Sequence, residues 1–204
     1  MDKQTHQQLK KEVEELRQLP GKQRGEHIKY SIDFVRKKEG EEAIEKIKNT
    51  LKEMDFDIGD VYKFSDTKWI PETITHIFIV AAARIFKWSE EDVFEMGKNL
   101  ATRSTIFKIF MQYFTSVDKT VKQGVKRWKN NFTRGQLEVK ELDKKNKKGT
   151  FVLRDFQTHP LICTLFQGFF KKILEIVTGN KKVEVKESKC MSDGYKYHEF
   201  PFKW

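Results

Sequence analysis

The order of β-prone and helical stretches in the C-terminal half constrains this chain most. Residues 187–204 have the pattern of two strands around a turn at 192–194, and the chain closes on aromatic residues. A long apolar stretch at 161–177 precedes them, and another pair of β-prone stretches comes before it. Strands joined as hairpins pair antiparallel and leave one face free for a helix, so this order predicts an antiparallel sheet packed on a long helix.

The individual strands follow from alternation and from turn residues. Residues 136–142 alternate apolar and polar side chains, and a turn at 146–149 leads into a second β-prone run. His159-Pro160 opens the long helix and Gly179 ends it. The predicted strands cover residues 136–142, 150–156, 183–186 and 196–202.

The N-terminal half has helical periodicity. Predicted helices cover 2–18, 25–38 and 41–54, a fourth that opens at Trp69-Ile70-Pro71-Glu72, a fifth from its cap Ser89 to about Ala101, and further helix at 105–113 and 117–128. The fourth helix is apolar nearly all round, which makes it the central one. We therefore expect an α+β fold, with an N-terminal extension helix at 1–24 and a single domain over 25–204.

Length and composition narrow the class of protein. A chain of 204 residues with 17 Phe can bury a sizeable core within one domain. Two distant Cys do not form a disulfide framework, which favours a reducing compartment. The N-terminus has no apolar run typical of a signal peptide, and the most apolar stretch, 74–86, is too short to span a bilayer. We expect a cytoplasmic protein.

The positive charge is concentrated in one segment. Residues 108–149 hold 12 Lys/Arg against 4 Asp/Glu. Its candidate anion-binding residues, on and just after one predicted helix, are Lys119, Lys122, Lys126, Arg127 and Lys129. Contact with nucleic acid or an anionic membrane is one interpretation; a solvated helix face is the other, and it is preferred because a charge run alone is weak evidence.

Signatures of enzymatic chemistry are missing from the sequence. It has no Gly-x-x-x-x-Gly-Lys-Ser/Thr loop, no Gly-x-Ser-x-Gly and no His-Glu-x-x-His. The prediction is a protein that is not an enzyme.

Several short motifs resemble one superfamily over about residues 25–204. It comprises haem–nitric-oxide/oxygen-binding (H-NOX) domains, vinyl-reductase-type domains and small subunits of vesicle-tethering transport-particle complexes, and the chain is similar in particular to an uncharacterised myxobacterial branch. The resemblance implies a domain that binds a small apolar molecule or a cofactor between its helical part and its sheet, and that often pairs. The matching stretches are Gly40-Glu41-Glu42-Ala43, Trp69-Ile70-Pro71, Asn131-Phe132-Thr133-Arg134-Gly135, His159-Pro160 with Gly168, and Gly194 with Phe202-Lys203-Trp204.

The haem-binding branch of that superfamily carries Tyr-x-Ser-x-Arg. By register with Gly168, the corresponding residues here are Phe156, Thr158 and Pro160, and Pro160 offers no guanidinium for a propionate. The axial His is also missing, since residues 104–132 contain no His. His76 remains as an alternative haem ligand, although a neutral core His is the preferred interpretation.

The vinyl-reductase-type branch suggests a metal site. Its metal-binding members carry Glu-x2-Cys-x7-Cys on the last hairpin, and this chain has Glu187, Cys190 and His198 at that spacing, with His in place of the last Cys. The fourth ligand would be Cys163 or His159. These ligand types suit zinc. The alternative is an isolated Cys and a surface His, so no cofactor is expected outright, with zinc or haem as the alternatives.

Together these features predict a non-enzymatic sensor that binds an apolar small molecule or a lipid. Haem-based gas sensing is the first alternative, and a structural dimer that contacts nucleic acid or membrane is the second. A homodimer is expected from the resemblance, with the N-terminal helix as a candidate contributor, and a protein partner would carry the signal. The predicted pocket residues are Phe78, Ile85, Phe107, Phe110, Met111, Phe114, Phe166 and Phe170.

Overall fold

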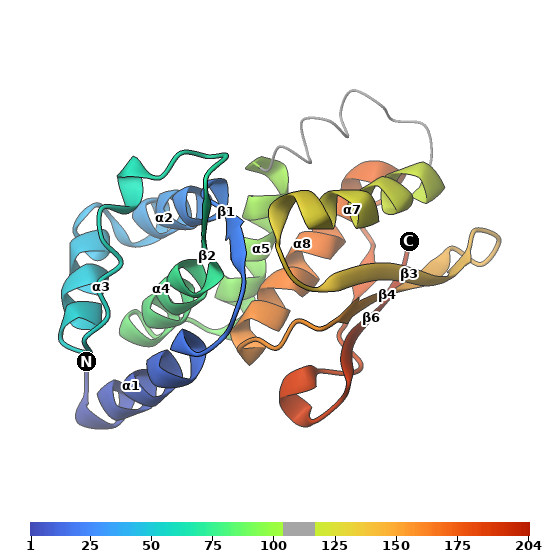
Figure 1. The fold of residues 1–204 in the computed structure, drawn as a ribbon. Coiled ribbons are helices and arrows are strands. Elements are labelled where there is room, and N and C mark those ends of the chain that lie inside the picture. Colours follow the sequence, from blue (N-terminus) through green and yellow to red (C-terminus); the bar gives the residue numbers. More distant parts are fainter. Residues whose placement is uncertain (104–116) are drawn as a thin grey trace. The chain divides into compact units, whose positions relative to one another are not determined.

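The computed structural model describes residues 1–103 and 117–204, with side chains from residue 124 onward in the second range (Figure 1). These residues form two compact units, which we call unit 1, Met1–Val93, and unit 2, Phe94–Trp204. Helices dominate unit 1, and an antiparallel sheet with helices forms unit 2, which confirms the α+β prediction. No helix within the described ranges is both long and apolar enough to cross a membrane.

Unit 1 is organised around α4, as its sequence predicts. Twelve of the fourteen residues of this helix are buried, and α1, α2 and α3 all pack on it. The helices of unit 1 are α1 (Lys3–Arg17), α2 (Glu26–Glu39), α3 (Glu42–Lys52), α4 (Glu72–Ile85) and the short 3-10 helix η1 (Val61–Lys63), and α5 (Glu90–Arg103) runs from unit 1 into unit 2.

A small sheet in unit 1 corrects one prediction. Trp69-Ile70-Pro71 was expected to open a helix, but these residues form β2, which pairs antiparallel with β1 (Lys22–Arg24). Ile70 precedes a proline, and that position favours an extended backbone over the α conformation. Helix α4 therefore begins at Glu72, directly after this strand.

The apolar stripe of α1 is used inside the chain. Leu9, Val13 and Leu16 are all buried, and α1 packs against α4. Arg84 of α4 donates two hydrogen bonds to the Glu12 carboxylate, at 2.7 and 3.0 Å. This stripe is therefore unavailable for the pairing between chains to which it was predicted to contribute. The predicted boundary between an extension at 1–24 and a domain at 25–204 stays a prediction.

Unit 2 contains a four-stranded antiparallel sheet in the order β3-β4-β6-β5. Its strands are β3 (Gln136–Asp143), β4 (Lys148–Arg154), β5 (Glu184–Val185) and β6 (Tyr197–Lys203), and its helices are α7 (Val117–Asn131) and α8 (Pro160–Thr178). The long helix α8 contacts β5, and α7 contacts β3 and α8 (Figure 1). Phe151 of β4 lies opposite Phe200 of β6, and α8 adds Phe170 to the same core.

Helices α5 and α8 approach each other closely through two glycines. A Cβ on Gly168 would lie 2.0 Å from the Phe94 carbonyl oxygen, and one on Gly97 would lie 2.0 Å from that of Leu165. Because both obstacles are backbone atoms, neither contact can be relieved by turning a side chain. The two positions therefore fix the spacing of these helices.

The last hairpin is less regular than predicted. Instead of a strand through Cys190, the chain forms the 3-10 helix η2 (Met191–Asp193), and β5 holds only two residues. One isolated bridge, Lys189 to Glu199, is what remains of the pairing near Cys190. The tight turn follows from hydrogen bonds of the Asp193 and Gly194 amides to the carbonyls of Cys190 and Met191, with Gly194 at a φ of 87°.

Candidate metal centre

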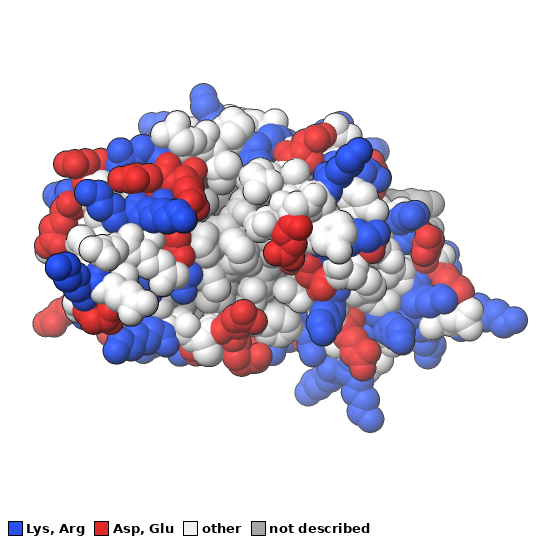
Figure 2. Space-filling model, turned by 90° about the horizontal axis from the view of Figure 1, so that it is seen from below, with Lys and Arg blue, Asp and Glu red and all other residues white. Residues whose placement is uncertain are grey.

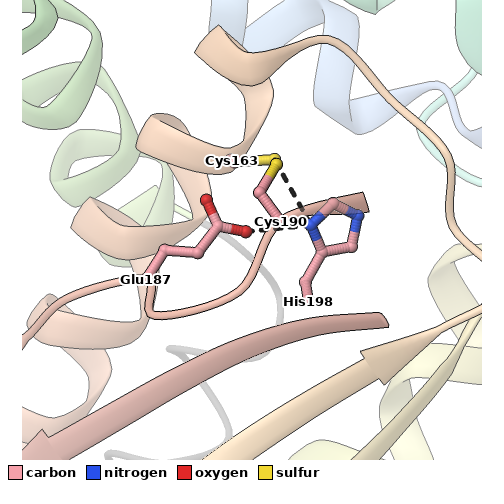
Figure 3. A group of neighbouring side chains, drawn as sticks. All are labelled: Cys163, Glu187, Cys190 and His198. Carbon is pink, nitrogen blue, oxygen red and sulfur yellow. Dashed lines mark hydrogen bonds and ion pairs between the residues drawn. The ribbon is translucent and has the colours of Figure 1, made fainter. Parts of the chain in front are cut away.

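Four metal-ligand side chains meet in unit 2. Cys163 comes from the first turn of α8, Glu187 and Cys190 from the irregular stretch between β5 and β6, and His198 from β6 (Figure 3). One ligand atom from each lies within 4.8 Å of every other. We call these four residues the donor cluster. Within the described ranges, it is the group of His, Cys, Asp and Glu side chains that could hold a metal ion.

Local structure explains why each donor points inward. His198, Phe200 and Phe202 occupy every second position of β6, so strand periodicity places all three on the core face. Cys163 lies on the buried face of the apolar helix α8. The η2 turn then brings Cys190 beneath that helix. The donor cluster is thus assembled from three separate parts of the chain.

The donor cluster is buried and closely spaced. Cys163 Sγ lies 3.6 Å from Cys190 Sγ and 3.5 Å from His198 Nδ1. The Glu187 Oε1 atom lies 2.9 Å from the same Nδ1. Cys163, Cys190 and His198 are 2%, 7% and 1% exposed, and Glu187 is half-buried. Without a metal ion, two thiols, an imidazole and a carboxylate this close together have to share protons.

The protonation equilibria show this competition. The hydrogen bond between the thiols, followed by burial, raises the pKa of Cys163, whereas the same hydrogen bond lowers the pKa of Cys190 to about 5. Burial raises the pKa of Glu187. Burial disfavours a charged His198, but hydrogen bonds to Glu187 and to the Phe156 carbonyl outweigh it and raise the pKa of the ring. A divalent cation would replace these shared protons, since thiolate and carboxylate bind metal only when deprotonated.

Of the two candidates for the fourth ligand, one lies among the other three predicted ligands and one does not. Cys163 belongs to the donor cluster. His159 instead caps α8, because its Nδ1 accepts a hydrogen bond from the Leu161 amide at 3.2 Å. A capping role for His159 could have been inferred from the following proline, since Pro is favoured at the first helical position. The choice of Cys163 required the position of α8 over the sheet.

Hydrogen bonds outside the donor cluster hold its members in place. His198 Nε2 lies 3.0 Å from the Phe156 carbonyl oxygen. The Glu187 amide donates to Gln167 Oε1 on α8 at 3.0 Å, and the Ser192 hydroxyl donates to the Thr158 carbonyl at 2.8 Å. Metal-ligating His residues characteristically donate their second ring N–H to such a carbonyl. These supporting contacts could not be predicted from the sequence, because each joins residues far apart in the chain and two of the three acceptors are backbone carbonyls.

The residues at the haem-motif positions do not fit a haem. Phe156 is fully buried among Trp128, Phe132 and Phe166, with ring centroids 5.2 to 5.7 Å away. Pro160 occupies the first turn of α8. This segment therefore presents a packed ring and a proline where the haem branch has a phenol and a guanidinium. The haem mode of that branch has no counterpart among the described residues.

The other predicted site residues lie in several parts of the chain. Phe78 and Ile85 are core residues of unit 1, and Phe166 and Phe170 are core residues of unit 2. His76 is buried in α4 and already has an interaction within the fold. A hollow of about 250 Å³ in unit 2 is lined by other residues, Lys148 and Phe202 among them. The remaining predicted pocket residues, Phe107, Phe110, Met111 and Phe114, lie outside the described residues.

The predicted basic segment is described in part. Lys119 and Lys122 lie within α7. Further along the same helix, the side chains of Lys126 and Lys129 are exposed and that of Arg127 is half-buried. Basic side chains also prevail at the right of Figure 2, where the β3–β4 hairpin projects. Anion binding there stays a prediction.

Comparisons with known proteins identify the fold. No family model matches the chain, and no curated protein matches it. Solved structures do match: an H-NOX protein from S. oneidensis in the Fe(II)NO state has 12% identity and a TM-score of 0.60, covering 88% of this chain and 98% of that one. For the unliganded Fe(II) H-NOX protein from K. algicida, the values are 12%, 0.64, 88% and 95%. For an oxygen-binding H-NOX domain related to soluble guanylate cyclases, they are 13%, 0.59, 88% and 94%.

The chain therefore has the H-NOX fold, as the sequence motifs predicted. At this level of identity the likeness concerns the fold alone, and function has to be argued from the sites.

Proposed function

We propose that this chain is a non-enzymatic ligand-sensing domain of H-NOX fold, whose unit 2 is organised around a Zn²⁺ ion held by Cys163, Glu187, Cys190 and His198. The observation that carries the proposal is the convergence of these four ligand atoms within 4.8 Å. Four protein donors occupy all positions of four-coordinate zinc, and such closed sites are structural, whereas catalytic sites keep a position open. When bound, the ion supplies cross-linking between elements and no reaction step.

The chemistry of the donors favours zinc over the other common cations. Ca²⁺ and Mg²⁺ require oxygen ligands, and this group offers one carboxylate. Two thiolates and an imidazole suit Zn²⁺, which tolerates a carboxylate as well. The ion would join the first turn of α8 to β6 and to the stretch that precedes it, whose regular structure is limited to the short helix η2.

Elemental analysis of the purified protein tests this metal assignment. We expect one Zn²⁺ per chain in the native protein and loss of the ion in a Cys163→Ser/Cys190→Ser variant. His159→Asn is the matched control, because Asn keeps the helix-capping function while removing the other candidate ligand. A native protein that takes up neither Zn²⁺ nor Co²⁺ would overturn the metal site. Loss of zinc in His159→Asn with retention in the Cys variant would overturn the assignment of residues.

An absorbance spectrum of the same sample tests the absence of haem. We expect no Soret band after expression with added haem precursor, because Phe156 and Pro160 stand at the positions of the propionate-binding motif. Stoichiometric haem in the purified protein would show that the sensor is haem-based. The zinc result is read independently of this spectrum.

For the sensed ligand, we propose an apolar small molecule or lipid, with a homodimer and a protein partner as the output. The support is the Phe-rich sequence at 105–114 together with the H-NOX fold. Extraction with organic solvent followed by mass spectrometry tests it. A protein purified from cells rich in lipid that yields no stoichiometric compound would count against this ligand class.

A further inference from the structure

His198 differs from the other three donors because one of its ring nitrogens can bind a metal while the other donates a hydrogen bond. Its Nδ1 faces the other donors, 2.9 Å from Glu187 Oε1 and 3.5 Å from Cys163 Sγ. Its Nε2 points the opposite way, to the Phe156 carbonyl oxygen at 3.0 Å. A carbonyl oxygen can only accept, so Nε2 must carry a proton. Nδ1, which lies 2.9 Å from Glu187 Oε1 and 3.4 Å from the Met191 amide nitrogen, is then the ring nitrogen that can bind a metal once the ion replaces these contacts.

The residue that receives this hydrogen bond is the centre of an aromatic cluster. Phe156 packs edge-on against Trp128 at 5.2 Å, and the Arg134 guanidinium lies over the Phe156 ring at 4.2 Å from its centroid. Trp128 in turn donates its indole N–H to the Arg134 carbonyl at 3.0 Å. The position of the Phe156 backbone thus affects ring packing that reaches α7.

The segment 156–159 lies next to the donor cluster, with contacts to residues near Cys190 and to the start of α8. The Ser192 hydroxyl, two residues beyond Cys190, donates to the Thr158 carbonyl at 2.8 Å. His159 then caps α8, and Cys163 follows within the first turn of that helix. Residues 156–159 have no regular secondary structure of their own. The Phe156 and Thr158 carbonyls are held from the side of the donor cluster, by His198 and by Ser192. The carbonyls between and after them have other partners, Arg134 for Gln157 at 2.9 Å and the Ile162 amide for His159 at 2.8 Å.

We propose that His198 binds the metal through Nδ1 and, through the Nε2 hydrogen bond to Phe156, makes the order of residues 156–159 depend on whether the metal is bound. This inference rests on the proposed metal site. It also gives a physical meaning to His198, which stands where the resembling metal-binding pattern has Cys. A Cys thiolate could bind the ion but has no second group to hold the Phe156 carbonyl.

Hydrogen exchange of the peptide spanning residues 155–162 tests the dependence. In the native protein, we expect exchange to slow by at least about tenfold when Zn²⁺ is added to the metal-free form. His198→Cys should still bind one Zn²⁺, because three thiolates and a carboxylate remain a zinc donor set, but its exchange at 155–162 should no longer respond. Cys190→Ser keeps His198 and is expected to lose the response by losing the metal.

Each outcome separates this inference from the proposed metal site. If native protein takes up no metal, the metal site itself fails. If native protein binds Zn²⁺ without any change at 155–162, or if His198→Cys binds Zn²⁺ and shows the full native response, the role of His198 in this inference is wrong.

A measurement on native protein decides the matter even if His198→Cys does not fold. With ¹¹³Cd²⁺ bound and His labelled with ¹⁵N, we expect coupling of cadmium to Nδ1 of His198 and a proton on Nε2. Cadmium coupled to Nε2 would overturn the inference, since that nitrogen could not then donate to Phe156.

Discussion

Unit 1 buries mainly aliphatic side chains supplied by helices, whereas unit 2 buries a network of Phe rings and four polar donors between a sheet and a helix. Their charges differ in the same way. Unit 1 holds 17 Lys/Arg and 19 Asp/Glu, and unit 2 holds 23 and 11. Unit 1 therefore depends chiefly on apolar burial and local ion pairs, whereas unit 2 also carries the ionisable groups of the donor cluster, for which we propose a metal ion.

One chain therefore contains an apolar core in unit 1 and, in unit 2, a core that also includes the ionisable groups of the donor cluster. In unit 1, the burial of α4 on all sides is sufficient reason for the helices to associate. In unit 2, the donor cluster without a metal leaves two thiols, a carboxylate and an imidazole in a buried space, where charge is disfavoured. We expect perturbations of the two units to give separable effects.

Metal removal should separate the units most strongly. A ligand present at 1,000 times its Kd stabilises the folded state by about 4 kcal/mol, and each kcal/mol shifts the unfolding temperature of a domain of this size by roughly 4 °C or more. Chelation should therefore lower the transition of unit 2 by roughly 15 °C. Single-Trp variants report each unit, through Trp88 in unit 1 and Trp128 in unit 2.

The control for this experiment is restoration of the transition by added Zn²⁺. Acid should mimic chelation, because the donors must lose protons to bind the ion, so the zinc-dependent part of the stability falls as pH is lowered. An equal shift of both Trp signals would show that the units do not differ in the way described.

The contact between α5 and α8 provides the next largest effect. Gly168→Ala places a Cβ 2.0 Å from a backbone oxygen, and we expect a loss of about 3 kcal/mol in the free energy of unfolding. Gly124→Ala in α7 is the matched control, since no atom of the described residues lies within 4 Å of the added Cβ and Ala favours a helix by about 0.5–1 kcal/mol. Urea denaturation of both variants measures the difference. Equal stabilities would disprove the close packing.

In unit 1, the ion pair between α1 and α4 should matter less than the contacts above. Glu12→Ala leaves Arg84 without its carboxylate, and we expect a loss of about 2 kcal/mol, below the cost in a fully buried pair because Arg84 is partly exposed. Glu15→Ala removes the exposed partner of Lys11 on the same helix and should change stability by less than about 0.5 kcal/mol. If the Trp128 signal shifted as much as that of Trp88, the effect would not be confined to unit 1.

The smallest predicted effect concerns pH and the start of α5. Hydrogen bonds from Lys38, then from the Ser89 hydroxyl and amide, lower the pKa of Asp92 from 3.8 to about 2. A depressed folded-state pKa stabilises the protein above the unfolded value, and the gain is lost as pH falls through about 2. Asp92→Asn should cost about 1 kcal/mol at pH 6, after allowance for solvent screening, and nothing near pH 2. A cost that stayed constant across that range would attribute the effect to packing.

Much of the fold could be predicted because it depends on local periodicity. The even burial of α4 and the alternation in β3 are properties of short windows, and the sequence contains them in full. The predictions that were wrong concern stretches where pairing decides the conformation. Trp69 and Ile70 form a strand because β1 lies beside them, and Cys190 leaves the sheet because η2 bends the chain.

The members of the donor cluster also differ in whether sequence spacing could predict them. Glu187, Cys190 and His198 could be named from spacing, because they lie close together in the chain. Cys163 and His159 could not be distinguished by spacing, since both lie at the start of α8, and a difference of four residues there is about one helical turn. Only the helix's position on the sheet shows which of the two faces His198.

By itself the sequence determined the α+β class, the order of most elements, three of the four donors and the lack of a haem-binding motif, because each of these is a matter of residue type and short-range spacing. The tertiary structure decided the fourth donor, the use of α1 within the chain and the hydrogen bond from His198 to Phe156. The physical reason is that these contacts join residues 27 to 72 positions apart or use a backbone carbonyl, and neither property can be seen in a window of sequence.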